Sequence, residues 1–308
     1  MKKSDEPAFP AVFAASCDLE GLHQDLARWN HARLGPSNPT GTWEEDLKTE
    51  HFMRWREGQW VEAFRAMVAD EAAATPADPE AFIGWFEGLK ETGPGQYDPL
   101  FDWLARDADP DAMRWFLTQE AAGEAGFDDL VALTQVKLPK RAKLELAANY
   151  WDEMGRGHIE GMHGPMLERT VETLGLTPTI ESTIWQSLAL ANTLTAFATT
   201  RRYAWHSVGA LGVVELTAPT RVSRVGQGLK RLGFAPIARK YFDLHAALDI
   251  KHAQDWIANA LRPLLQDNPE CRVSLAEGAL MRLYAGAACF EAYRSHLWRR
   301  QLMRFAAE

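Results

Sequence analysis

Two histidines and an aspartate lie close together in residues 241–256, which read YFDLHAALDIKHAQDW. His245, Asp249 and His252 are spaced by four and three residues, and on a helix that turns about 100° per residue they fall within roughly 60° of one another. Neutral imidazole and ionised carboxylate suit Fe(II), Mn(II) or Zn(II), whereas magnesium or calcium would be held by oxygen donors. The triple is equally compatible with a polar helix face carrying two solvated histidines, so the rest of the chain has to supply matching ligands.

A second group of donors lies in residues 149–166, NYWDEMGRGHIEGMHGPM. Glu160 and His163 form the Glu-x-x-His pattern of di-iron carboxylate bundles. On a continuous helix, Glu153 returns to within about 80° of the direction of His163, so either carboxylate could join the histidine. Gly155 and Gly157 each cost about 0.8–1 kcal/mol in a helix relative to Ala, which close packing or room for a substrate would justify. The alternative is a set of surface residues on a helix weakened by glycine.

Two further carboxylates are candidates because of their surroundings. Glu215 interrupts the apolar segment ALGVVELTAP, where burial without a partner would be costly and a bound cation would remove the cost. It could instead reach solvent at a helix end before Pro219. Glu120, in RWFLTQEAAGE, belongs to an amphipathic pattern and could be an ordinary surface residue. Together, the histidines and carboxylates provide the donors that two divalent cations need, and mixed ligation with open positions suits iron that activates dioxygen.

Helices are predicted to position these donors. Their ranges are near residues 18–34, 43–74, 79–91, 109–123, 126–135, 139–162, 178–202, 203–217, 219–232 and 237–264, with a last helix that opens at the capping box Ser274-x-x-Glu277. Because no segment has a convincing strand pattern, the predicted fold class is all-α.

The first third of the chain is rich in tryptophan. It contains Trp29, Trp43, Trp55, Trp60, Trp85 and Trp103. Such residues favour core packing or a subunit contact, which leaves a homodimer open. We predict a tail over residues 1–16 within an N-terminal Trp-rich helical extension (1–108), followed by the main domain (109–308).

Composition excludes several classes of partner. A net charge of −9 and a pI near 5.5 argue against a nucleic-acid binder, which needs a concentrated basic surface. Cys17, Cys271 and Cys289 are far apart and odd in number, which indicates a reducing cytoplasm rather than a disulfide framework. The first residues lack a signal-peptide core, and the longest uncharged run, 182–200, is too polar to span a membrane. We expect a cytoplasmic protein that acts on a small molecule, without nucleic-acid or membrane partners.

The chain resembles the superfamily of haem-oxygenase-like di-iron oxidases and oxygenases, often described as iron-containing redox enzymes. The resemblance covers roughly residues 109–300. It rests on the segment DEMGRGHIEGMH, on Glu215 and on the His-x3-Asp-x2-His pattern at 245–252. It implies a haem-oxygenase-like helical bundle, two iron ions or an iron and a manganese ion, and dioxygen as co-substrate.

The resemblance also implies a set of metal ligands on core helices. They are Glu120, Glu153 or Glu160 with His163, Glu215, and the triple His245, Asp249 and His252. Glu120 matches a first-helix glutamate that only some members use, and its separation from His163 is longer than usual. Haem oxygenases need one proximal histidine without a carboxylate cluster, and thiamine-degrading relatives use a cysteine nucleophile, so both fit less well. The expected function is a non-haem di-iron oxidase or oxygenase acting on a small organic substrate; the alternative is a non-catalytic metal-binding or accessory helical protein.

Overall fold

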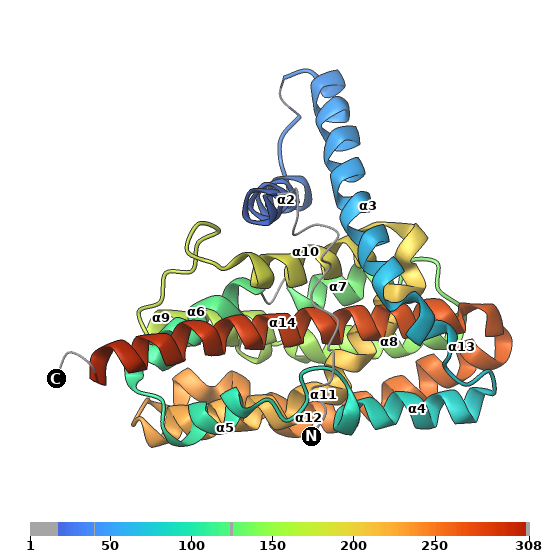
Figure 1. Ribbon diagram of the computed structural model, residues 1–308. Coiled ribbons are helices and arrows are strands. Elements are labelled where there is room, and N and C mark those ends of the chain that lie inside the picture. Colours follow the sequence, from blue (N-terminus) through green and yellow to red (C-terminus); the bar gives the residue numbers. More distant parts are fainter. Residues whose placement is uncertain (1–17, 40, 124–125, 306–308) are drawn as a thin grey trace.

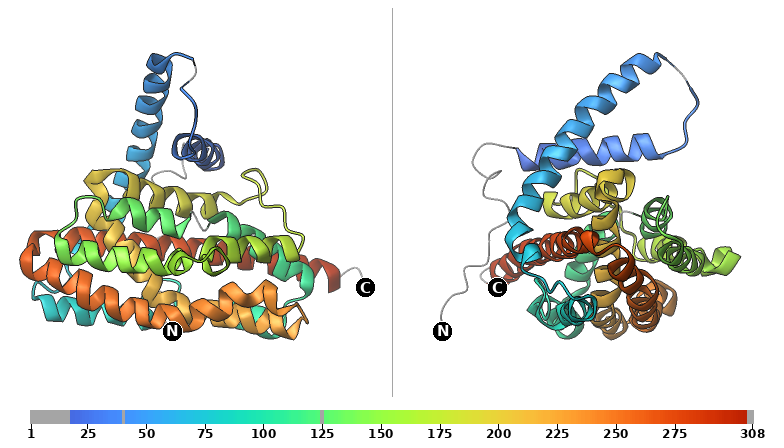
Figure 2. Two further views of the ribbon diagram at one scale, coloured as in Figure 1. Left: turned by 180° about the vertical axis from the view of Figure 1, so that it is seen from behind. Right: turned by 90° about the vertical axis from the view of Figure 1, so that its right-hand side faces the viewer.

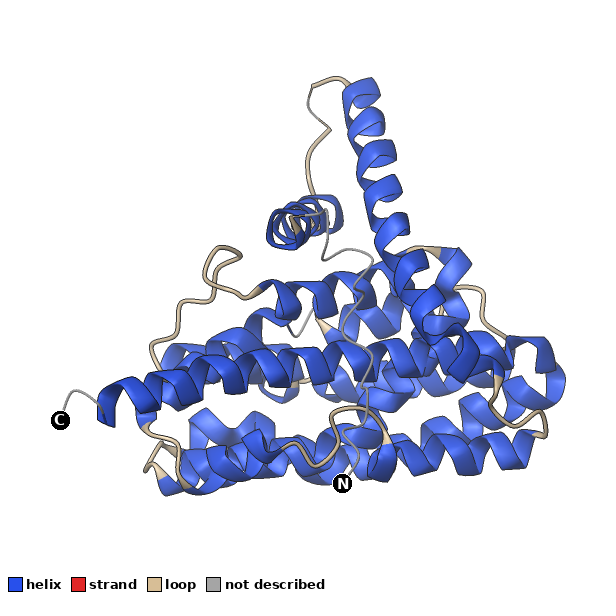
Figure 3. Cartoon of the chain, viewed as in Figure 1, coloured by secondary structure: helices blue, strands red, loops and turns tan. Residues whose placement is uncertain are grey.

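The structure, a computed structural model, describes residues 18–39, 41–123 and 126–305. These residues form helices and loops without a β-strand (Figure 3), so the predicted all-α class is confirmed. The predicted tail over residues 1–16 lies outside the described residues. The longer helices are α2 (Leu19–Leu34), α3 (Trp43–Ala73), α4 (Pro79–Thr92), α5 (Pro99–Arg106), α6 (Pro110–Gly123), α7 (Phe127–Thr134), α8 (Lys140–Glu153), α9 (His163–Thr173), α10 (Trp185–Thr199), α11 (Ala204–Arg231), α12 (Pro236–Asp255), α13 (Arg262–Asp267) and α14 (Arg272–Phe305). None of them is both long and apolar enough to cross a lipid bilayer.

Helix α11 lies at the centre of the bundle, against α12, α14 and α5 (Figure 1). Its crossing with α14 depends on two glycines. A Cβ atom on Gly209 would overlap the carbonyl of Leu275, and one on Gly278 would overlap the carbonyl of His206. The two backbones can approach this closely only because neither glycine carries a side chain.

The N-terminal helices pack on and into the same bundle. Figure 2 shows α3 rising obliquely from the body and α2 lying over α10. The C-terminal half of α3 is buried: Trp60 is 1% exposed, and its Nε1–H donates to Oγ1 of Thr193 at 2.8 Å. The N-terminal half projects outward, with Trp43 69% and Trp55 57% exposed. The tryptophan-rich region therefore contributes both to the core and to the surface, while the domain boundary at residue 108 and the homodimer stay predictions.

Two predicted helix boundaries are wrong for local reasons. Helix α10 begins at Trp185 rather than near residue 178, because Thr179 and Ser182 bond to each other and to nearby backbone groups in a turn that competes with helix. Helix α11 continues through Pro219 instead of stopping before it. A proline inside a helix removes one hydrogen bond and costs about 3 kcal/mol, and here the buried apolar faces of α11 outweigh that cost.

The last helix also differs from its prediction. Helix α14 begins at Arg272, two residues before the expected capping serine. Glu277 does not cap it. Its Oε2 lies 2.7 Å from Nε2 of His206 and 3.0 Å from Nε of Arg65, so it joins α14 to α11 and α3.

Candidate metal centre

The histidine and aspartate triple on α12 faces the interior of the bundle. His245, Asp249 and His252 are 8%, 4% and 4% exposed, in agreement with one shared helix face. Nδ1 of His245 lies 2.7 Å from the carbonyl oxygen of Tyr241. Because a carbonyl only accepts, the ring donates its Nδ1–H there and keeps the Nε2 lone pair for a metal ion. The helix thus presents an imidazole in the tautomer that metal binding requires.

Glu153 and His163 meet across a break in the chain rather than along one helix. Helix α8 ends at Glu153, two short 3-10 turns follow, and α9 begins at His163. Gly155 adopts a φ of +60°, and a Cβ atom on it would overlap the backbone of Gly161. The prediction of a single helix to residue 162 is therefore wrong, because the glycines of this segment allow the chain to fold back on itself.

The break brings only one of the two candidate carboxylates to His163. Oε2 of Glu153 lies 2.7 Å from Nδ1 of His163, yet that nitrogen has no aligned hydrogen-bond partner. This close approach without alignment is expected of two ligands aimed at a common cation. Glu160 instead has a side chain that is 84% exposed and pairs with Arg169 at 3.0 Å. The predicted Glu160–His163 pair does not form in the structure, since the 3-10 turn turns Glu160 outward.

Glu215 reaches the same interior from α11. It is 2% exposed, so it does not extend to solvent at a helix end. Its Oε1 accepts a hydrogen bond from Nδ2 of Asn149 at 2.7 Å, and its Oε2 lies 3.5 Å from Nδ1 of His252. On the other side of that ring, Nε2 lies 3.3 Å from Oδ2 of Asp152. Carboxylates thus flank both ring nitrogens of His252.

The side chains form two groups that could each hold a metal ion. In each group, one donor atom from every member lies within 4.8 Å of the others. The groups are Glu153, His163 and His245, and Glu153, Glu215 and His252. Glu153 belongs to both groups.

Burial and neighbouring charge prepare two of the histidines for metal binding. Burial, assisted by the charge of His252, lowers the pKa of His163 to about 4. Burial and the adjacent His163 lower the pKa of His245 to about 4 as well. Both rings are therefore neutral at pH 7, the form that binds metals. Burial also lowers the pKa of His252, but Glu215 and other acidic neighbours outweigh it and raise the value to about 9.

The carboxylates of the cluster repel one another. Burial, followed by the charge of Glu215, raises the pKa of Glu153 well above its ordinary value. The same two causes, in the same order, raise the pKa of Asp249 to about 9. Oδ1 of Asp249 is also buried without a hydrogen-bond partner. A buried cluster of acids in this state is costly, and divalent cations would remove the cost.

Two of the predicted ligands lie beside the two groups rather than in them. Asp249 lines the same cavity as Glu153 and Glu215 but does not complete either three-residue group among the described residues. Glu120 lines another part of the cavity wall. It bonds to Tyr293 and interacts with the charges of Arg221 and Arg282, which makes it a neighbour of arginines instead of imidazoles.

The cavity has a volume of about 160 Å³, enough for a small organic molecule. Its wall is mostly apolar. The carboxylates of the two groups that could hold a metal ion, here called the metal-competent groups, line one part of it, and a second set of polar residues lines another. The polar lining residues are Glu120, Glu153, Thr170, Glu215, Arg221, Tyr241, His245, Asp249, Arg282 and Tyr293.

Sequence reasoning missed the residues that complete this interior. Asn149 lies one turn before Glu153 on α8 and could have been found as a polar residue on the same helix face. Arg221 lies on α11 and Arg282 on α14. The sequence indicates a role for them only in that each lies on a helix with many buried residues. Their convergence on one cavity depends on the crossing of the two helices.

The fold and this cluster define a class: an all-helical protein with a buried set of carboxylates and imidazoles that could bind metal. Residues 114–287, more than half of the chain, match the family described as iron-containing redox enzyme. The chain belongs to this haem-oxygenase-like family and is accordingly a redox enzyme. The matched region contains every candidate ligand. A comparison with curated proteins found no match.

Proposed function

We propose that the chain is a non-haem di-iron oxidase or oxygenase that uses dioxygen to oxidise a small organic molecule held in the cavity. The observation that carries the proposal is the membership of Glu153 in both metal-competent groups. A single mononuclear site would not need a shared carboxylate between two sets of donors. Mixed nitrogen and oxygen ligation favours iron, or iron with manganese, over magnesium or calcium.

The donor atoms support two bound ions. Nδ1 of His163, Nδ1 of His252 and Oδ1 of Asp249 are buried without hydrogen-bond partners, which would be a rare loss if nothing bound there. In the proposal, His163 and His245 would hold one ion, Glu215 and His252 would hold the other, and Glu153 would serve both. Asp249 lines the same cavity and would act as an additional ligand when the site fills. Two iron ions, when bound, supply the redox equivalents for the reduction of dioxygen.

The surrounding residues would orient the ligands and keep water out. The carbonyl of Tyr241 fixes the ring of His245, and Asn149 holds one oxygen of Glu215. Such supporting hydrogen bonds maintain ligand geometry in metal sites. Apolar side chains from several helices line the rest of the cavity, which favours the binding of an organic molecule over storage of metal alone.

The test is anaerobic loading with Fe(II), followed by metal analysis and by measurement of dioxygen consumption on mixing with oxygen. We expect two iron ions per chain and uptake of oxygen. Iron binding without oxygen uptake would indicate the non-catalytic metal-binding alternative, and the absence of iron binding would exclude both.

The two glutamates on either side of the glycine break provide a matched pair of variants. Glu153→Gln removes the shared ligand, so the bound iron should fall from two ions to one or none. Glu160→Gln alters an exposed carboxylate of the same segment and should leave two ions bound. Equal loss in both variants would contradict the assignment of Glu153. Circular dichroism serves as the control for helix content.

A further inference from the structure

A second polar group lines the cavity apart from the candidate ligands. It consists of Arg221 on α11 and Arg282 on α14, with Glu120 and Tyr293 beside them. Arg282 is 8% exposed, and both arginines line the cavity wall. Arginines that line an interior cavity are rare unless paired, so two in one small cavity require an explanation.

The chain does not satisfy these guanidinium groups by itself. Nη1 of Arg221 and Nε of Arg282 are buried without hydrogen-bond partners. Within the described part of the chain, neither side chain forms an ion pair shorter than 4 Å. Glu120 is the carboxylate whose charge acts on both arginines, and Asp249 acts on Arg221 as well. Because Asp249 is a candidate metal ligand, Glu120 is the carboxylate that serves the arginines alone, and it can neutralise only one of the two positive charges. One positive charge and several N–H donors are left over.

The surroundings hold the two guanidinium groups in place. Arg221 lies over the ring of Phe290, with Cζ 5.6 Å from the ring centroid, a favourable cation–π distance. A Cβ atom on Gly286 would lie 2.5 Å from Nη1 of Arg282, so the glycine leaves room for that guanidinium. Burial lowers the pKa of Arg221 only to about 9, and the group therefore keeps its charge at neutral pH.

We propose that Arg221 and Arg282 bind the anionic group of the substrate, a carboxylate on an otherwise apolar organic molecule. The inference rests on the proposed function for its reaction, although binding itself does not require turnover. Guanidinium groups bind carboxylates through paired N–H···O bonds. A single excess positive charge matches a carboxylate better than a phosphate ester, which carries up to two negative charges at neutral pH.

The position of the arginines also orients the substrate. Arg221 follows Glu215 by six residues on α11, which places the two about 9 Å apart along the helix axis. An acid held by its carboxylate at the arginine end would extend its apolar part along Leu and Val side chains toward the metal-competent groups. Oxidation would then occur on the apolar part, away from the carboxylate.

The experiment is calorimetric titration of the protein loaded with Zn(II), which is not redox active, so that binding is measured without turnover. The probes are hexanoate, the neutral hexanamide, and hexyl phosphate. Hydrogen bonds to a charged group contribute about 1.5–3 kcal/mol, so hexanoate should bind at least roughly tenfold more tightly than hexanamide. Equal binding of hexanoate and hexanamide would overturn the proposal, and tighter binding of hexyl phosphate would assign the site to phosphate esters instead.

Variants of three residues decide whether the arginines are responsible. Arg221→Gln and Arg282→Gln should each abolish the preference for hexanoate over hexanamide. Arg262→Gln, at an arginine on α13 that pairs with Glu80 outside the cavity, should retain it. Because loss of a buried arginine could unfold the chain, Arg221→Lys provides a second measure: it keeps the charge but loses the paired geometry, and should weaken hexanoate binding severalfold.

Glu120→Gln should change hexanoate affinity in the opposite direction, and it also tests whether Glu120 is a metal ligand. It removes the charge that partly neutralises the arginines but retains an oxygen that can accept from Tyr293, so hexanoate should bind more tightly. Bound zinc should stay at the wild-type level. If zinc is lost, Glu120 is a metal ligand and the arginine site as described is wrong. If two metal ions bind but the protein does not prefer hexanoate over hexanamide, the inference fails while the proposed function stands. If hexanoate is preferred but no metal binds, the proposed function fails while the inference stands.

Discussion

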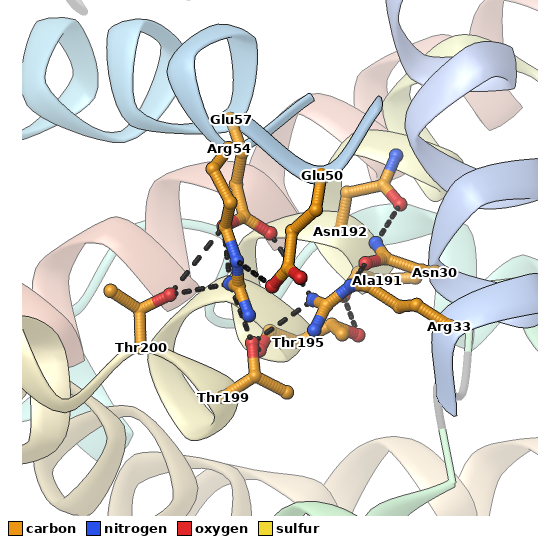
Figure 4. A network of polar contacts seen from close by, with 10 residues as sticks. All are labelled: Asn30, Arg33, Glu50, Arg54, Glu57, Ala191, Asn192, Thr195, Thr199 and Thr200. Atoms are coloured by element: carbon orange, nitrogen blue, oxygen red, sulfur yellow. Dashed lines mark hydrogen bonds and ion pairs between the residues drawn. The ribbon is translucent and has the colours of Figure 1, made fainter. Parts of the chain in front are cut away.

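Two buried clusters of charge in this protein differ in one respect: whether their polar atoms have partners within the chain. The first surrounds Glu57 at the junction of α2, α3 and α10 (Figure 4). Arg54 donates to Glu57 at 2.9 Å, and Arg33 lies 3.4 Å from its other oxygen. The hydroxyl groups of Thr199 and Thr200 accept further hydrogen bonds from the arginines. Among the described residues, no buried polar atom of Glu57, Arg33 or Arg54 lacks a partner.

The second cluster, around Glu153, is equally buried but incomplete. Its carboxylates face other carboxylates and imidazoles, and several nitrogen and oxygen atoms have no partner. A complete network of buried charges joins helices, whereas an incomplete one provides atoms for something that the chain does not contain. The number of buried charges is therefore less informative about a ligand site than the presence or absence of partners for them. The following substitutions test that distinction.

The largest effect of a single substitution is expected when the complete cluster loses its carboxylate. Glu57→Ala leaves Arg33 and Arg54 near each other without a counter-charge, and should lower the free energy of unfolding by about 3–4 kcal/mol. Metal binding should stay at the wild-type level. Glu50→Ala is the control, since the Glu50 side chain is 55% exposed and lies 3.7 Å from Arg54. Urea denaturation measures both variants, and a loss below that of the Glu50 control would show that the cluster is not structural.

A comparable effect is expected at low pH next to the complete cluster. His23 on α2 is fully buried between Trp60 and Trp185, and burial, assisted by Arg56, lowers its pKa from 6.5 to about 3. Below pH 6.5 the unfolded chain binds a proton at His23 that the folded chain does not bind, so the free energy of unfolding falls as the pH decreases from 6.5 toward 3. At about pH 4 the loss from this group should reach about 3 kcal/mol.

His23→Leu should remove this contribution without a large change at alkaline pH. Between neutral pH and about pH 4, the free energy of unfolding of this variant should then depend less steeply on pH than that of the wild type, as measured by denaturation at each pH. His31→Leu, at an exposed histidine of the same helix, is the control and should leave the pH dependence unchanged. If the free energy of unfolding depends on pH equally steeply in His23→Leu and in the wild type, the role of the buried imidazole is contradicted.

Much of the incomplete cluster could be predicted from residue spacing. The four- and three-residue spacing of His245, Asp249 and His252 is a property of one helix, and a helix face is fixed by sequence separation alone. Glu215 was recognisable because a carboxylate in an apolar segment needs a partner. The all-α class followed in the same way from apolar periodicity.

The choice between Glu153 and Glu160 could not be made from spacing. It depends on whether the chain between Glu153 and His163 is one helix, and the positive φ at Gly155 ends that continuity. Glycine permits such a conformation without requiring it, so its presence predicts neither a helix nor a break. The convergence of Arg221 and Arg282 was inaccessible for another reason: it arises from the packing of α11 against α14, which no local pattern encodes.

Metal binding should stabilise the protein through the incomplete cluster only. At a free metal concentration of about 100 times Kd, each occupied site raises the free energy of unfolding by about 2.7 kcal/mol. Glu57→Ala should show the same gain from Mn(II) or Zn(II) as the wild type, starting from a lower baseline. Glu153→Gln should show little or no gain. Thermal denaturation with and without a chelator measures the difference, and a gain that Glu153→Gln retains in full would place the ions elsewhere.

The smallest expected effect is the most direct test of the comparison. In metal-free protein, Glu153→Gln replaces a carboxylate that burial and Glu215 already make costly to ionise, and glutamine resembles its protonated form. The free energy of unfolding should therefore stay constant or rise by about 1 kcal/mol, in contrast to the loss expected for Glu57→Ala. Glu160→Gln, on the exposed side of the same segment, should be neutral. A loss of stability in metal-free Glu153→Gln as large as that of Glu57→Ala would mean that Glu153 holds the fold together through the chain's own contacts, and the distinction between a complete and an incomplete cluster would no longer identify a ligand site.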